Sequence, residues 1–110
     1  MRAVFVAAGV SEEQAAIVAD SLVESNLVGH DSHGVLRVGS YVEMIERRSV
    51  DPFAEPEIVR SSATTAVVDG HNGLGIVVAR QAMGMAMEKA AMHDVGLVVV
   101  EHLGHTGRMG

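Results

Sequence analysis

Two short apolar runs on either side of a helix-length segment constrain this fold more than any other feature of the sequence. Thr65–Val68 is rich in β-branched residues and ends at Asp69-Gly70, and Gly96–Val100 is a second run of the same kind. The segment between them, from about Leu74 to His93, is rich in Ala and Met, which favour helices. Two such runs separated by one helix predict neighbouring parallel strands joined by a right-handed crossover.

Two helices are predicted ahead of this unit. Ser11 and Gln14 have the spacing of a capping box, and apolar residues recur behind them at helical intervals, so a helix is expected over about 11–28. A second helix is expected from Asp31 or Ser32 to about Arg47. Its predicted buried face consists of Val35, Val38, Val42 and Ile45.

The fold class that follows is mixed α/β (α+β). We expect a helical region over residues 1–60, with a loop at its two prolines, Pro52 and Pro56, and a strand–helix–strand unit over residues 61–110. The last strand leads into the loop 102–110 with no later helix to cover it, which favours a truncated fold. A core built mainly from Ala and Val, with only two Phe and one Tyr, also buries little area per residue.

Charge and composition exclude several classes of function. The net charge is −6 and Lys and Arg are scattered, which disfavours a nucleic-acid or anionic-membrane partner. Because the chain has no cysteine, disulfide scaffolds and cysteine-type zinc sites are excluded. No run approaches the ~20 apolar residues of a membrane span, and Ser11-Glu12-Glu13 follows the short apolar start without a cleavage pattern. A cytoplasmic protein is expected.

The segment His30–Arg37 holds the first group of residues suited to chemistry. On the helix predicted from Ser32, His33, Arg37 and Tyr41 would form one polar stripe at i, i+4 and i+8. A guanidinium can hold a carboxylate by two hydrogen bonds, and an imidazole can move a proton near neutral pH. The pattern therefore favours a site for a small anion, although a solvated polar face with a capping serine has the same spacing.

The loop His102–Gly110 holds the second group. It follows a predicted buried strand, and open α/β sheets bind ligands at the carboxyl ends of their strands. Its glycines allow close backbone approach, and His105 could act as an acid or base or hydrogen-bond a cofactor. A flexible glycine-rich turn is the alternative interpretation.

Two other patterns have weaker functional interpretations. Asp69–Gly75 leads from a strand to a helix without the glycine order of a dinucleotide-binding turn, so a tight structural turn is expected there. The pairs His30/His33 and His102/His105 raise a metal-binding hypothesis, but neither has an evident third ligand, so no metal site is predicted.

Taken together, these motifs resemble the malate/L-lactate/ureidoglycolate dehydrogenase family. The resemblance covers the chain from about Val4 to Gly110 and combines several motifs in the family's order. They are Gly9–Ala15, Gly29–Arg37 with Tyr41, Asp69–Gly75 followed by Ala82-Met83, and Gly104–Arg108 followed by Gly110. It implies a non-Rossmann dehydrogenase fold with a helical N-terminal region, a homodimer, and hydride transfer between NAD or NADP and a 2-oxoacid or 2-hydroxyacid. It also implies that most of the cofactor site lies in sequence beyond Gly110.

The resemblance further implies roles for single residues. His33 matches a proton donor with Ser32 as its relay, and His105 matches the histidine that serves as acid or base in another branch of the family. Arg37 and Tyr41 correspond to substrate-binding positions. Thr106 and Gly107 are expected to contact the cofactor. Two alternatives remain open: a non-catalytic remnant or interaction module that folds only by association, and a small histidine-based metal protein.

Overall fold

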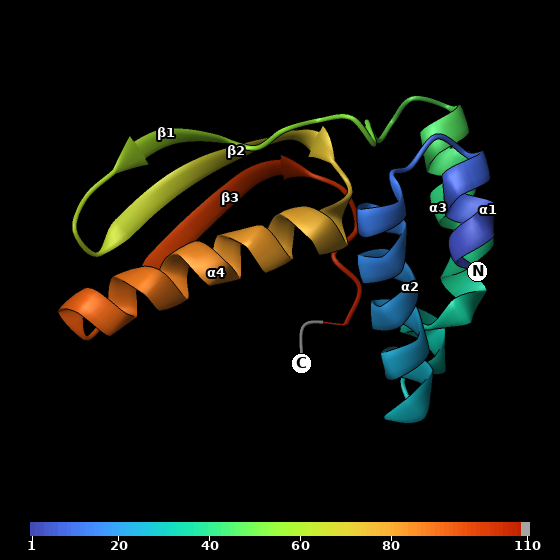
Figure 1. Ribbon diagram of the computed structural model, residues 1–110, viewed down its shortest axis with the longest axis horizontal. Coiled ribbons are helices and arrows are strands. Elements are labelled where there is room, and N and C mark those ends of the chain that lie inside the picture. The colour runs from blue at the N-terminus through green and yellow to red at the C-terminus, as the bar shows by residue number, and fades with distance from the viewer. Residues whose placement is uncertain (109–110) are drawn as a thin grey trace.

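The computed structural model describes residues 1–108, in which a group of helices stands at one end of a three-stranded sheet (Figure 1). Met109 and Gly110, the end of the predicted loop 102–110, lie outside the described residues. In chain order the elements are α1 (Arg2–Ala7), α2 (Glu12–Leu27), two short 3-10 turns (Asp31–His33 and Val35–Arg37), α3 (Val38–Glu46), β1 (Glu57–Ser61), β2 (Thr65–Gly73), α4 (Gly75–His93) and β3 (Leu97–Leu103).

Helix α2 confirms the first predicted helix. The Ser11 hydroxyl accepts a hydrogen bond from the Gln14 amide at 3.2 Å, as the capping pattern predicts. At the other end, Gly29 adopts a φ of +86° and the His30 amide donates to the Ser25 carbonyl at 2.8 Å. This is the closing pattern that a glycine after a helix allows.

The second predicted helix is wrong at its start, because α3 begins at Val38 and not at Asp31 or Ser32. The side chain of Asn26 accepts from the Val35 amide at 2.7 Å and donates to Asp31 at 2.9 Å. These bonds hold the chain in two 3-10 turns that meet at Gly34, where a Cβ would lie only 2.0 Å from the Asn26 oxygen. Val35, predicted to be buried, is 42% exposed as a result.

The sheet has the order β1-β2-β3. Strands β2 and β3 are parallel, with Thr65 opposite Leu97 and Asp69 opposite Glu101, as the strand–helix–strand pattern predicts. Strand β1 follows the loop predicted at Pro52 and Pro56 and was not itself predicted; it pairs antiparallel with β2. The first predicted strand was expected to end at Asp69-Gly70, whereas β2 continues to Gly73 across an irregularity in its pairing with β3. The helix predicted between these two strands is confirmed as α4.

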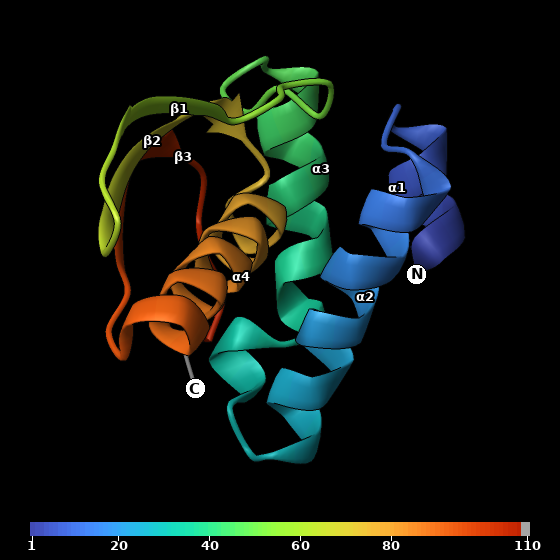
Figure 2. The same cartoon turned by 60° about the vertical axis from the view of Figure 1, so that its left-hand side comes forward.

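Helix α4 covers one face of the sheet, and its first turn meets the other helices (Figures 1 and 2). The main core lies at that junction. It includes Phe5, Val10, Ala15, Val18, Leu22, Tyr41, Ile45, Val50, Leu74, Ile76 and Val77. The loop that follows β3 crosses this junction, so side chains of the loop are brought to the helices α2 and α3. None of the helices in the described part of the chain has the length and apolar character needed to cross a bilayer.

Candidate active site

The loop after β3 reaches the helices because Gly75, the first residue of α4, has no side chain. A Cβ on Gly75 would lie 2.2 Å from the Gly104 carbonyl oxygen and 2.4 Å from that of His105. The Gly104 amide donates to the Gly73 carbonyl at 3.1 Å, which ties the loop to the end of β2. These contacts fix the backbone that carries His105.

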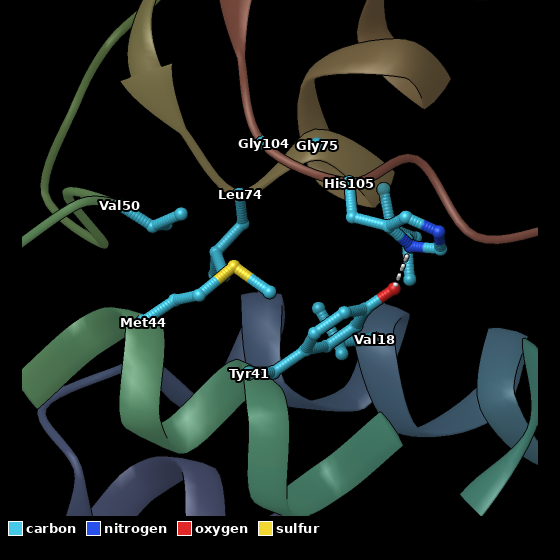
Figure 3. A pocket seen from close by; sticks show the side chains of 9 residues that line it. Val18, Tyr41, Met44, Val50, Leu74, Gly75, Gly104 and His105 are labelled. Atoms are coloured by element: carbon cyan, nitrogen blue, oxygen red, sulfur yellow. Dashed lines mark hydrogen bonds between the residues drawn. The ribbon is translucent and has the colours of Figure 1, made fainter. Parts of the chain in front are cut away.

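His105 is held from α3 and from its own loop. Its Nδ1 lies 2.8 Å from the hydroxyl oxygen of Tyr41 (Figure 3), and the Gly107 amide donates to the same nitrogen at 3.2 Å. Tyr41 is 5% exposed and packs in the core, next to a pocket that Val18, Met44 and Leu74 also line. The phenol therefore reaches the imidazole from a buried, well-packed position.

His33 lies beside His105. The two imidazole rings stack at a centroid distance of 5.6 Å and an interplanar angle of 30°. The Ser32 hydroxyl lies 3.0 Å from Nδ1 of His33. Since His33 belongs to a 3-10 turn, the predicted helical stripe does not exist, and the residues meet through the loop geometry instead.

Arg37 completes the group. Its Nε donates to the Ser32 carbonyl at 2.8 Å, and its guanidinium is close enough to His105 for its charge to act on that ring. Within residues 1–108 its terminal nitrogens make no hydrogen bond or ion pair to protein. Burial raises the pKa of Tyr41, an effect that the charge of Arg37 opposes. Although His105 is exposed overall, partial desolvation of its ring lowers its pKa, and the charges of Arg37 and His33 add to the same effect. A neutral His105 next to a cationic Arg37 is therefore favoured near neutral pH.

The structure thus brings together His33, His105, Ser32, Arg37 and Tyr41, all of which the sequence analysis singled out. What sequence reasoning missed is the bond between Tyr41 and His105, since Tyr41 was expected to contact substrate. Gly107, expected to contact the cofactor, is buried with a φ of +70°, and its amide is directed at His105. Thr106 lines a groove between α2 and α4, together with Ser21, Arg80 and Arg108.

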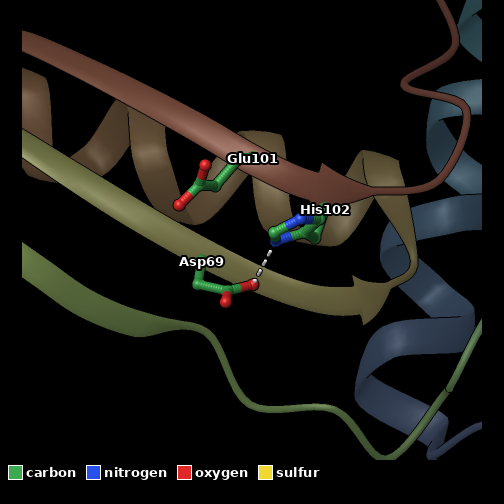
Figure 4. Close-up of side chains that lie close together, drawn as sticks. All are labelled: Asp69, Glu101 and His102. Carbon is green, nitrogen blue, oxygen red and sulfur yellow. Dashed lines mark hydrogen bonds and ion pairs between the residues drawn. The ribbon is translucent and has the colours of Figure 1, made fainter.

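The histidine pairs considered as metal ligands have different surroundings. The rings of His30 and His33 lie edge to face at 6.3 Å. Nδ1 of His102 lies 3.1 Å from an Asp69 oxygen, and these two residues and Glu101 place possible ligand atoms within 4.8 Å of one another (Figure 4). Hydrogen bonding by the His71 amide, more than the nearby histidine side chains, lowers the pKa of Asp69. Among residues 1–108, no group of three possible ligands contains both histidines of either pair.

Comparisons with known proteins give one consistent result. A model of the malate/L-lactate dehydrogenase family matches residues 1–110. L-sulfolactate dehydrogenase of Methanocaldococcus jannaschii is 40% identical over 102 residues, which are 93% of this chain and 30% of that protein. Hydroxycarboxylate dehydrogenase B of Escherichia coli O157:H7 is 36% identical over 110 residues, which are 100% of this chain and 30% of that protein.

Solved structures agree in fold. Malate dehydrogenase from Entamoeba histolytica superposes with a TM-score of 0.95 at 40% identity, covering 100% of this chain and 31% of that one. For sulfolactate dehydrogenase from M. jannaschii the TM-score is 0.96 at 38% identity, covering 99% and 32%. The chain therefore spans about 30% of the length of the curated relatives that it matches. Nothing in these comparisons supports a non-catalytic interaction module.

Proposed function

The chain belongs to the malate/L-lactate dehydrogenase family, and on that premise we propose that it supplies the substrate-binding and proton-donating residues of a dehydrogenase that reduces a small 2-oxoacid to a 2-hydroxyacid. The observation that supports this most is the grouping of two stacked imidazoles with one guanidinium. When NADH or NADPH is bound, it supplies a hydride to the carbonyl carbon. The carbonyl oxygen then takes a proton, and this chain has the groups to give it.

Arg37 is proposed to hold the substrate carboxylate. A guanidinium has five N–H donors in a fixed plane, and Nε already donates to the Ser32 carbonyl at 2.8 Å. That bond orients the plane and leaves the terminal nitrogens for the two oxygens of a carboxylate. The substrate's carboxylate would then sit next to the two histidines.

His33 is proposed as the proton donor. Its Nδ1 faces the Ser32 hydroxyl at 3.0 Å, and a hydroxyl can donate to a neutral imidazole or accept from a protonated one. Ser32 thus stays bonded to His33 through a full protonation cycle. His105 is less suited to carry the charge, because burial, Arg37 and His33 all lower its pKa. Proton transfer from a positioned histidine typically contributes about a hundredfold to ten-thousandfold in rate.

The cofactor contacts, the oligomer and the location belong to the same proposal. The groove beside Thr106 contains Arg80 and Arg108, whose guanidinium groups suit a phosphate of NAD or NADP. Arg108 also lies 3.6 Å from Glu24, so a bound phosphate would compete with that carboxylate. The homodimer and cytoplasmic location that the family resemblance implies remain predictions, as does the division at residue 60.

The proposal is tested by assaying the complete enzyme with NADH and NADPH against the 2-oxoacids that correspond to lactate, malate and sulfolactate. Arg37→Lys should lower kcat/KM about tenfold to a hundredfold, because lysine cannot form the two-pronged grip. Arg47→Lys is the matched control, since Arg47 is an exposed arginine at the end of α3 paired with Glu43. Equal kcat/KM values for Arg37→Lys and the control would remove Arg37 from substrate binding. No turnover of any 2-oxoacid would contradict the proposed reaction.

A further inference from the structure

We propose that Tyr41 is a positioning residue that acts together with the Gly107 amide to hold His105 in the tautomer with its proton on Nε2. His105 would then meet the substrate oxygen as a neutral hydrogen-bond donor. The identity of the group that receives this bond rests on the proposed function. The tautomer itself is a property of the residues of this chain, and it can be measured without turnover.

The Gly107 amide provides the first constraint. A backbone N–H only donates, so a nitrogen that receives it must offer a lone pair. The Gly107 amide lies 3.2 Å from Nδ1 of His105, which means that Nδ1 has no proton when this bond is made. Gly107 itself has a φ of +70°, in the region that favours glycine.

Tyr41 adds a second donor to the same nitrogen. Its hydroxyl oxygen lies 2.8 Å from Nδ1, and burial raises the pKa of the phenol, so the hydroxyl keeps its proton. Because Nδ1 is already an acceptor, the hydroxyl must donate to it. In a neutral imidazole with an unprotonated Nδ1, the one N–H is on Nε2.

Protonating Nδ1 would break this arrangement. The new N–H on Nδ1 would face the Gly107 N–H, which cannot accept a hydrogen bond. Only the Tyr41 hydroxyl could reverse its role and accept from Nδ1. The nearby positive charges of Arg37 and His33 oppose a cationic His105 as well. His33 has no such restriction, since its Nδ1 partner is a hydroxyl that can reverse its role. The two stacked imidazoles therefore have different roles: His33 can change its protonation state, whereas His105 stays neutral and donates a hydrogen bond from Nε2.

The test is a long-range proton–nitrogen NMR spectrum of the protein labelled with nitrogen-15 in histidine, recorded at about pH 8. His105→Gln identifies the His105 signals, and the signals of the other histidines serve as internal references. We expect Nδ1 of His105 to show the shift of an unprotonated ring nitrogen and Nε2 that of a protonated one. A protonated Nδ1 in the unsubstituted protein would overturn the proposal.

Tyr41→Phe then distinguishes the contribution of the Tyr41 hydroxyl from that of the Gly107 amide. Losing the hydroxyl should increase the population of the Nδ1–H tautomer and lower kcat of the complete enzyme about tenfold, the scale of one hydrogen bond, with little change in KM. A tautomer and a kcat that are both unchanged in Tyr41→Phe would remove Tyr41 from this role. If the Nε2–H tautomer is found but no 2-oxoacid is reduced, the inference on His105 stands and the proposed function fails.

Discussion

Substituting Gly75 with alanine tests whether the position of His105 depends on the close approach of its loop to α4. The new Cβ would lie 2.2 Å from the Gly104 carbonyl oxygen, whereas ordinary contact begins at 3.4 Å, so the loop must move by about 1.2 Å. Both of its nearest neighbours are backbone carbonyl oxygens, at Gly104 and His105, and these cannot rotate away as a side chain can.

The expected cost follows from this displacement. Overfilling a packed site costs about 1–3 kcal/mol, and replacing glycine by alanine in a helix returns at most about 1 kcal/mol. A net loss of about 1–2 kcal/mol lowers the Tm of the complete enzyme by a few degrees Celsius, because the shift per kcal/mol shrinks as the chain grows longer. A shift of about 1 Å in a catalytic group can lower turnover about a hundredfold. Both effects should appear in Gly75→Ala.

Gly84→Ala is the control for this prediction. Gly84 is also in α4, but nothing lies within 4 Å of a Cβ built on it. It should therefore stabilise the protein by about 0.5–1 kcal/mol and leave kcat unchanged. Thermal denaturation and turnover of the complete enzyme are compared for both variants. If Gly75→Ala melts and turns over like Gly84→Ala, the close approach at Gly75 does not position His105.

Two further predictions concern stability. Because the pKa of His105 is lowered in the folded state, the unfolded chain binds more protons below about pH 6.5, so the free energy of unfolding should fall as the pH falls through that range. Urea denaturation between pH 8 and pH 5.5 measures this, and His105→Gln should reduce the slope; an identical slope would contradict it. Ser11→Ala removes the cap of α2 at the Gln14 amide and should cost about 1 kcal/mol, measured by the same denaturation, whereas no loss would show that water replaces the cap.

The features that were predicted correctly depend on neighbours in sequence. The Ser11 cap, the glycine that ends α2 and the apolar runs of β2 and β3 are short-range patterns, and each is confirmed. The predicted start of α3 was wrong because a residue distant in sequence sets where this helix begins. The Asn26 side chain, nine residues before Val35, binds the Val35 amide and interrupts the helix at Gly34.

Strand β1 was missed for a different reason. The sequence of Glu57–Ser61 does not alternate apolar and polar residues, because neither face of the strand is buried. Two prolines also precede it. Ile58-Val59, two adjacent β-branched residues, is the one signal that favours an edge strand there.

In the candidate site, too, the residue types were predictable from the sequence but a contact between distant residues was not. His33, Arg37 and His105 were predicted from residue types and motifs, and they do lie close together. The bond between Tyr41 and His105 joins residues 64 positions apart, and no spacing pattern specifies such a pair. Their meeting depends on the path of the loop over Gly75, which is a property of the folded chain.

Turnover of His33→Ala in the complete enzyme, measured together with its affinity for the nicotinamide cofactor, tests the proposed site most directly. If His33 donates the proton, 2-oxoacid reduction should fall about a hundredfold to ten-thousandfold. The dissociation constant for NADH or NADPH should stay within about twofold, because the residues proposed to contact the cofactor lie elsewhere. Turnover equal to that of the unsubstituted enzyme would show that His33 does not supply the proton and would contradict the central claim.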